Sequence, residues 1–278
     1  MTERNRKDLG GSEPRGNRPA LAAVSSDTRP SQQGSSIEPT IYLLMKMFEE
    51  AKYAEDFIAG RLYMNPLQYF LSLERRCGAG DERGDQFEAA QAVYSPSRVV
   101  LSVAGRVIPA GDIASPILLH SDDLAAKNVF CLYSLNSRTH GSEDCTSLAA
   151  LKAALRVDRR CDAFGEHCVV LTNATKFIER VMAAFRRDGL KCIQLGLVKY
   201  FDDASYSGRL DTPGLGFMKR GAFEWQSEYR ILVDTGRSEP SPHVLNVGDL
   251  SDIALRLATS EFNDQLEVVL GDGPSKRR

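Results

Sequence analysis

The sequence predicts a single α+β domain with a mixed, mostly antiparallel sheet and flanking helices, preceded by a disordered N-terminal tail. The chain has 278 residues, of which 42% are hydrophobic and 26% charged, values typical of globular domains. Short segments of strand type are mixed with helical segments, without the regular alternation that predicts a parallel sheet. Residues 1–40 contain no aromatic side chain, so the folded part is expected to begin after them.

Composition divides the chain into a tail at 1–40, a domain at 41–270 and a flexible basic C-terminus at 271–278. The tail is rich in Arg, Ser, Gly, Pro and Gln, and it holds too little apolar surface to offset the entropy cost of ordering. We interpret it as a solvated spacer or a gene-start artefact, or alternatively as the leader of an injected effector.

Charge and hydropathy argue against a non-specific nucleic-acid-binding protein and against a membrane-spanning protein. The formal net charge is −2, whereas binding through non-specific phosphate contacts needs a large basic excess. No segment approaches the ~20 consecutive apolar residues of a membrane-spanning helix. The charged first residues are not followed by the apolar core of a signal peptide. We therefore expect a cytoplasmic protein with no membrane partner.

The six cysteines show no tight pairing in a chain much longer than disulfide scaffolds, which favours reduced thiols. Neither CxxC nor HxxxH spacing occurs, so we expect no metal site. Cys131 is interpreted as a small buried hydrophobic residue without a histidine partner.

The N-terminal part of the domain is predicted to alternate between helix and strand. Apolar side chains recur at helical spacing from Ile41 to Ala51, which predicts an amphipathic helix over 41–59 that ends at Gly60. Asn65 and Pro66 predict the cap and the first residue of a second helix. The other elements expected here are a strand at 61–64, that helix at 67–76, a loop at 77–90, and a β-hairpin at 99–103 and 106–108.

The rest of the domain is predicted to contain most of the strands. Residues 128–135 (NVFCLYSL) have the aromatic and β-branched content of a buried strand. Asn173 predicts the cap of a helix that ends at Gly189. The other expected elements are strands at 167–172, 192–201, 225–234, 244–247 and 266–270, helices at 147–155 and 249–259, and a loop at 202–216.

Residues 224–229 carry the most informative pattern. In a strand, alternate side chains share one face, so Glu224, Gln226 and Glu228 are expected side by side. Such a polar face is either exposed to solvent, as in many antiparallel sheets, or the wall of a cleft. In a cleft, a carboxylate and an amide can bind neighbouring sugar hydroxyls. The carboxylate can also stabilise the positive charge that develops as a glycosidic bond breaks.

Gln226-Ser227-Glu228 resembles the Q-x-E strand motif of ADP-ribosyltransferases. The resemblance implies a catalytic Glu228 that bonds the nicotinamide-ribose hydroxyl of NAD, the substrate. It also implies that Gln226 positions the acceptor, an unknown protein or nucleic acid. The early basic residue of that family, near the nicotinamide nucleotide, is matched by Arg61, which would contact a phosphate or ribose of NAD.

Further NAD contacts follow from the same hypothesis. Tyr133-Ser134 is similar to the aromatic-polar element of the family's central strand, and Ser134 would brace the nicotinamide side. Tyr63 or Tyr229 would stack on the nicotinamide.

A second resemblance covers roughly 41–260. The order of a G-x-L-x-x-N-P turn, an acidic RGDQFE loop, a V-F-C strand and a W-x-x-E-Y-R segment is similar to the layout of a bacterial family. This is domain of unknown function 2971, found near mobile elements and defence loci, and it implies no particular activity.

A competing hypothesis is a non-catalytic interaction or regulatory module of a bacterial defence or mobile-element system. The polar face at 224–228 would then contact solvent or a partner. Asp85 and Glu88 in the acidic loop are interpreted either as cation ligands or as a solvated loop. The oligomeric state is not predicted.

Overall fold

A computed structural model of the chain describes residues 39–77, 84–141, 145–210 and 214–269. The expected tail, apart from residues 39 and 40, and the expected flexible segment 271–278 lie outside the described residues. The described part confirms the α+β class with mostly antiparallel sheets.

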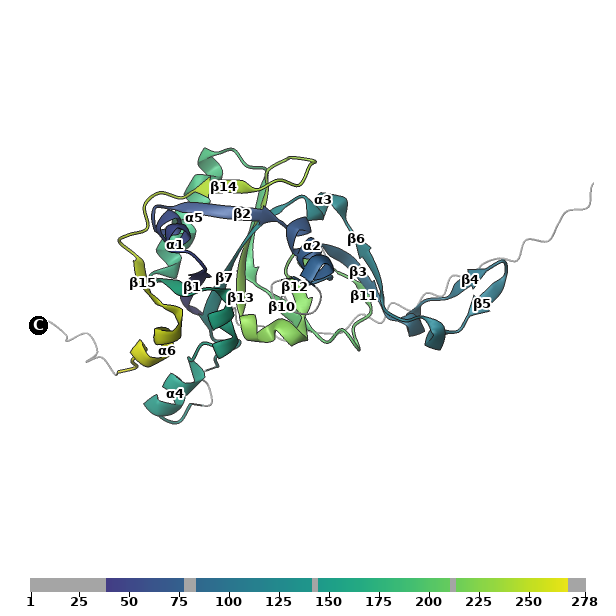
Figure 1. The fold of residues 1–278 in the computed structure, drawn as a ribbon, viewed down its shortest axis with the longest axis horizontal. Coiled ribbons are helices and arrows are strands. Elements are labelled where there is room, and N and C mark those ends of the chain that lie inside the picture. Colours follow the sequence, from purple (N-terminus) through teal and green to yellow (C-terminus); the bar gives the residue numbers. More distant parts are fainter. Residues whose placement is uncertain (1–38, 78–83, 142–144, 211–213, 270–278) are drawn as a thin grey trace, which may run out of the picture. The chain divides into compact units, whose positions relative to one another are not determined.

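An eight-stranded sheet forms the centre of the domain, in the order β14-β2-β7-β1-β8-β15, with β13 joined to β7 and β9 joined to β13. Its strands are shown in Figure 1. Their bounds are β1 (Ile41–Phe48), β2 (Arg61–Pro66), β7 (Asn128–Asn136), β8 (His167–Leu171), β9 (Cys192–Leu197), β13 (Glu228–Asp234), β14 (His243–Asn246) and β15 (Ala254–Ala258).

Strand β7 organises this sheet because its two edges differ. One edge pairs without a break with β13, from Asn128 to Tyr133. The other edge is shared, since β2 pairs with residues 128 and 129 while β1 pairs with residues 133–136. The three residues between these pairings have no strand partner on this edge. The sheet therefore splits where β1 and β2 diverge from β7.

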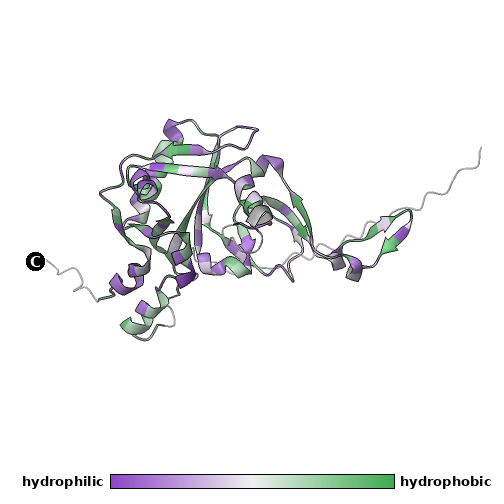
Figure 2. Cartoon of the chain, in the orientation of Figure 1, coloured by the Kyte–Doolittle hydropathy of each residue, from purple (hydrophilic) through white to green (hydrophobic). Residues whose placement is uncertain are grey.

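The larger core lies on the face of the sheet covered by α1 (Ala51–Ile58) and α5 (Ala174–Arg187) (Figure 1). Phe57 of α1 contacts both Phe130 of β7 and Phe177 of α5, with ring centroids 5.5 and 6.2 Å apart. Figure 2 shows hydrophobic residues along the strands of the central sheet. The opposite face carries smaller apolar clusters, one of them around Met45 and Tyr133.

No helix in the described residues is long and apolar enough to cross a membrane. The domain also contains several smaller helices and strands. The remaining helices are α2 (Leu67–Cys77), α3 (Asp122–Ala125), α4 (Leu148–Ala154) and α6 (Phe262–Gln265). The remaining strands form a three-stranded sheet of β3 (Ala90–Tyr94), β6 (Ile117–His120) and β11 (Gly208–Arg209), the hairpin β4 (Leu101–Val103) with β5 (Arg106–Ile108), and the parallel pair β10 (Lys199–Phe201) and β12 (Met218–Arg220).

The predicted helix over 41–59 is wrong in its first half. Residues 41–48 form strand β1, and only 51–58 are helical. Leu44 and Met45 are both fully buried, and they belong to clusters on opposite faces of the sheet. A strand buried on both faces is apolar almost continuously, which also satisfies helical spacing.

Three C-terminal predictions are corrected, the strand predicted at 225–234 only in its first three residues. Residues 221–226 form a 3-10 helix, and β13 begins only at Glu228, after Ser227 in the left-handed region (φ 40°). Residues 254–258 of the predicted helix form β15, because the edge of β8 supplies backbone hydrogen-bond partners. Residues 266–269 form no strand.

The strongest local patterns are confirmed. Strands β2, β7, β8 and β14, helices α2, α4 and α5, and the β4–β5 hairpin lie where the sequence placed them, within a few residues. The Asn173 side chain accepts from the backbone N–H of Lys176 at 2.8 Å and so caps α5 as expected. The predicted strand 192–201 is divided into β9 and β10.

Candidate functional site

A cavity of about 640 Å³ lies where the sheet splits. Phe130, Cys131 and Leu132, the residues of β7 that pair with neither β1 nor β2, line it, together with side chains from β1 and β2. A split strand edge leaves backbone groups without a ladder partner, and these must find another partner or face a ligand. The carbonyl oxygen of Cys131 is one such group, and it accepts a hydrogen bond from Lys46 Nζ at 2.8 Å.

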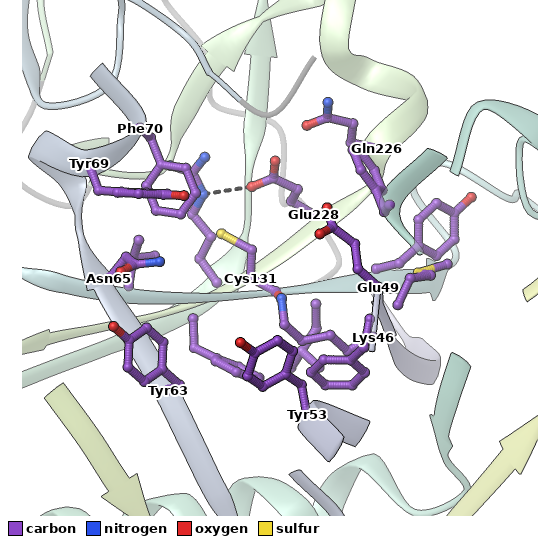
Figure 3. Close-up of a pocket in the computed structure, with 18 of the residues that line it drawn as sticks. Lys46, Glu49, Tyr53, Tyr63, Asn65, Tyr69, Phe70, Cys131, Gln226 and Glu228 are labelled. Carbon is purple, nitrogen blue, oxygen red and sulfur yellow. Dashed lines mark hydrogen bonds and ion pairs between the residues drawn. The ribbon is translucent and has the colours of Figure 1, made fainter. Parts of the chain in front are cut away.

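The walls of this pocket combine aromatic and charged side chains (Figure 3). In this view Gln226 and Glu228 lie on one side, and Tyr53 and Tyr63 lie on the opposite side. Aromatic surface with a few polar groups is the usual composition of a small-molecule site. The aromatic residues are Phe48, Tyr53, Tyr63, Tyr69, Phe70, Phe130, Tyr133 and Phe164.

The predicted pair Gln226 and Glu228 is brought together at the pocket wall, although not by a continuous strand. Lys219 Nζ of β12 donates to Gln226 Oε1 at 2.6 Å and to Glu228 Oε1 at 2.7 Å. Both side chains therefore converge on one ammonium. Glu224, the third member of the expected face, lies in the 3-10 helix and is exposed outside the pocket lining.

Glu228 belongs to a buried network of two carboxylates and two cations. Arg230 Nε donates to Glu228 Oε2 at 2.8 Å. The other end of the same guanidinium donates to both oxygens of Glu88, at 2.6 and 2.8 Å. A bidentate arginine–carboxylate pair of this kind is strong and geometrically specific. The network fixes Glu228 from both sides while its edge faces the cavity.

The network keeps Glu228 ionised. Burial alone would raise the pKa of this carboxyl, but Arg230 and then Lys219 outweigh the burial and hold the pKa well below its usual range. At neutral pH the pocket wall therefore presents a carboxylate at this position.

Acid is expected to weaken the fold through this carboxylate. Because the folded-state pKa of Glu228 is depressed, its contribution is complete above the unfolded value of about 4.3 and is lost as the pH falls through the folded pKa. Urea unfolding at several pH values between 7 and 3 measures this loss. We expect a shallower decline below pH 5 in Glu228→Gln than in the matched exposed variant Glu224→Gln. Equal slopes in the two variants would contradict the assignment.

Arg61 and Tyr63 line the same pocket, from β2. Arg61 is paired with Asp56 of α1 and is about half exposed, so its charge is already partly compensated. Tyr63 is 57% exposed, which leaves it available to a ligand at the pocket mouth. The structure therefore brings four of the six expected residues, Arg61, Tyr63, Gln226 and Glu228, to one cavity.

Ser134 and Tyr229 lie elsewhere, which corrects two expectations. Ser134 is fully buried, and its backbone carbonyl accepts from Ser227 Oγ at 2.7 Å, so it closes the junction of β7 and β13. Tyr229 alternates with Glu228 along β13 and packs in the large core on the other face of the sheet. Burial raises the pKa of Tyr229 to about 12.

The interpretation of the acidic loop as solvated or cation-binding is also wrong. Asp85 and Glu88 are buried, and they pair with Arg220 and Arg230. These charges have no local sequence signal, because each partner lies more than a hundred residues away in the chain. Arg230, by contrast, is two residues after Glu228 in one strand, a spacing that places both side chains on one face.

Cys131 lies at the floor of the pocket as a protonated thiol. Burial raises its pKa to about 12, so it is not a thiolate at neutral pH. The described cysteines whose side chains are placed, Cys131, Cys145, Cys161, Cys168 and Cys192, form no disulfides. Within the described ranges, no group of three or more His, Cys, Asp or Glu side chains is arranged to hold a metal ion.

Comparisons with protein-family models, with curated proteins and with solved structures found no match to this chain.

Proposed function

We propose that the chain binds NAD in the pocket at the sheet split and acts as an ADP-ribosyltransferase-like enzyme. The observation that carries this proposal is the convergence of Gln226 and Glu228 on Lys219 at the pocket wall. The transferred group would reach a protein or nucleic-acid acceptor, in the cytoplasm.

Glu228 has the properties that cleavage of the nicotinamide–ribose bond requires. Its two oxygens accept from Lys219 and Arg230, and an ionised carboxylate offers about four acceptor positions, so capacity remains for a ribose hydroxyl. Its negative charge, held in place by the network, stabilises the oxocarbenium-like ribose as nicotinamide leaves. Gln226 lies beside it at the pocket wall and would position the acceptor.

The size and walls of the pocket suit a dinucleotide. About 640 Å³ is within the usual range of ligand pockets, roughly 300–1,000 Å³. Tyr63 at the mouth offers a ring face to the nicotinamide or the adenine.

A second candidate function is binding without cleavage, as a regulatory or interaction module of a bacterial defence or mobile-element system. Two observations favour it. The charge of Glu228 is already balanced by two cations, and Ser134 is turned away from the pocket.

Incubation of the full chain with NAD distinguishes these functions. An enzyme releases free nicotinamide in proportion to protein and time, which chromatography detects, with water as acceptor in the absence of another. A binding module gives a calorimetric titration with NAD and no nicotinamide. The absence of both signals would overturn the assignment of the pocket to NAD.

A further inference from the structure

Four cationic side chains line the pocket, and three of them already have a carboxylate partner. Lys219 pairs with Glu228, Arg230 pairs with Glu88 and Glu228, and Arg61 pairs with Asp56. Lys46 of β1 is the exception: it forms no ion pair with any carboxylate in the described ranges. The pocket therefore contains one ammonium whose charge is not balanced by a direct neighbour.

The surroundings of Lys46 hold this ammonium at the sheet split. Its Nζ donates to Cys131 O at 2.8 Å and lies 4.7 Å from the centre of the Phe130 ring. An ammonium has three donors, and the Cys131 carbonyl accounts for one of them. Burial lowers the pKa of Lys46 by more than the charge of Glu228, which forms no ion pair with it, raises it, so the cost of placing this ammonium away from water is only partly offset. An anionic ligand group would remove that cost.

We infer that Lys46 is the anion-binding residue of the pocket and that it holds a phosphate group of a nucleotide. This inference rests on the proposed function, because NAD supplies such a phosphate. It revises the expectation that Arg61 makes this contact, since Arg61 is already paired with Asp56 and is about half exposed to solvent.

Two features select a nucleotide rather than a simple anion. Tyr53 lines the same pocket as Lys46, so a ring and a phosphate can be bound together (Figure 3). Glu228 lies on the opposite wall, where its ionised carboxylate only accepts hydrogen bonds and therefore suits the sugar hydroxyls rather than a phosphate.

Calorimetric titration of the full chain with ADP-ribose and with adenosine tests the inference, because only the first probe carries phosphate. We expect wild type to bind ADP-ribose more tightly than adenosine. Lys46→Gln keeps a donor for the Cys131 carbonyl but removes the charge. It should weaken ADP-ribose binding roughly 10- to 100-fold, the usual range for one charge-assisted hydrogen bond, while adenosine binding changes little. Lys46→Arg should recover part of the loss.

The matched control is Lys176→Gln, since Lys176 is an exposed residue of α5 that pairs with Asp252, and both lie outside the pocket lining. It should bind ADP-ribose like wild type. The inference is overturned if Lys46→Gln retains the preference for ADP-ribose, if Arg61→Gln loses it instead, or if wild type binds no ADP-ribose. Circular dichroism and thermal unfolding verify that each variant is folded.

The outcomes separate this inference from the proposed enzyme. Lys46-dependent binding of ADP-ribose without nicotinamide release would retain the phosphate site and reject the transferase. Nicotinamide release that persists in Lys46→Gln with unchanged KM would retain the transferase and reject the phosphate site.

Discussion

Replacing Arg230 by methionine is expected to lower the free energy of unfolding by about 3–5 kcal/mol, the usual cost of breaking a buried ion pair from one side. The guanidinium of Arg230 holds Glu88 and Glu228, and it also donates to the carbonyl of Gly216 at 2.8 Å. Methionine fills a similar volume, so the expected loss of stability comes from carboxylates that lose their cationic partner and not from a cavity. The carboxylates left behind are both buried.

Urea unfolding of Arg230→Met and of Arg237→Met measures this cost. Arg237 is exposed, and its guanidinium donates to Ser241 Oγ at 3.2 Å, so its replacement should change stability by less than about 0.5 kcal/mol. A loss at Arg230 as small as that at Arg237 would show that the network does not stabilise the fold.

Replacing Glu228 by glutamine is expected to reduce nicotinamide release from NAD by about 100- to 10,000-fold, the range for loss of an electrostatic group at a transition state. Glutamine keeps the shape and one acceptor oxygen, but it removes the charge that faces the developing oxocarbenium. NAD binding should change much less than turnover, because the ribose hydroxyl retains a partner.

The matched variant Glu224→Gln makes the same substitution four residues away, at an exposed position outside the pocket lining. It should retain wild-type turnover. Glu228→Gln is expected to lose some stability, because Lys219 and Arg230 then face a neutral partner. Rates are therefore compared below the melting temperature of both variants. Equal turnover in the two variants would remove Glu228 from the mechanism.

The parts of the fold that could be predicted are those that local sequence determines. Asn173 and Gly189 mark the two ends of α5 through local capping. The aromatic and β-branched residues of β7 favour a buried strand whatever lies around them. Strand β1 was missed because Leu44 and Met45 enter two different cores, a fact that only the assembled sheet reveals. Strand β15 depends on the edge of β8, which is distant in the sequence.

The candidate site was predictable to a similar degree. The spacing of Gln226 and Glu228 predicts that their side chains lie together. Ser227 between them is in the left-handed region and interrupts the strand, but the two side chains still meet because both accept a hydrogen bond from Lys219. Glu88 could not be found, since its partner is brought from far along the chain. Lys46 did carry a signal, a single lysine in the apolar run IYLLMKMF, which a buried strand tolerates only where the charge meets a partner or a cavity.

A crystal structure of full-length Glu228→Gln grown with saturating NAD tests the central claim most directly, since this variant should bind the dinucleotide without consuming it. The account predicts density for NAD in the cavity between β1 and β2, with the nicotinamide ribose against residue 228 and a phosphate within hydrogen-bonding distance of Lys46 Nζ. An empty cavity at full NAD saturation, or NAD bound on another surface, would contradict it.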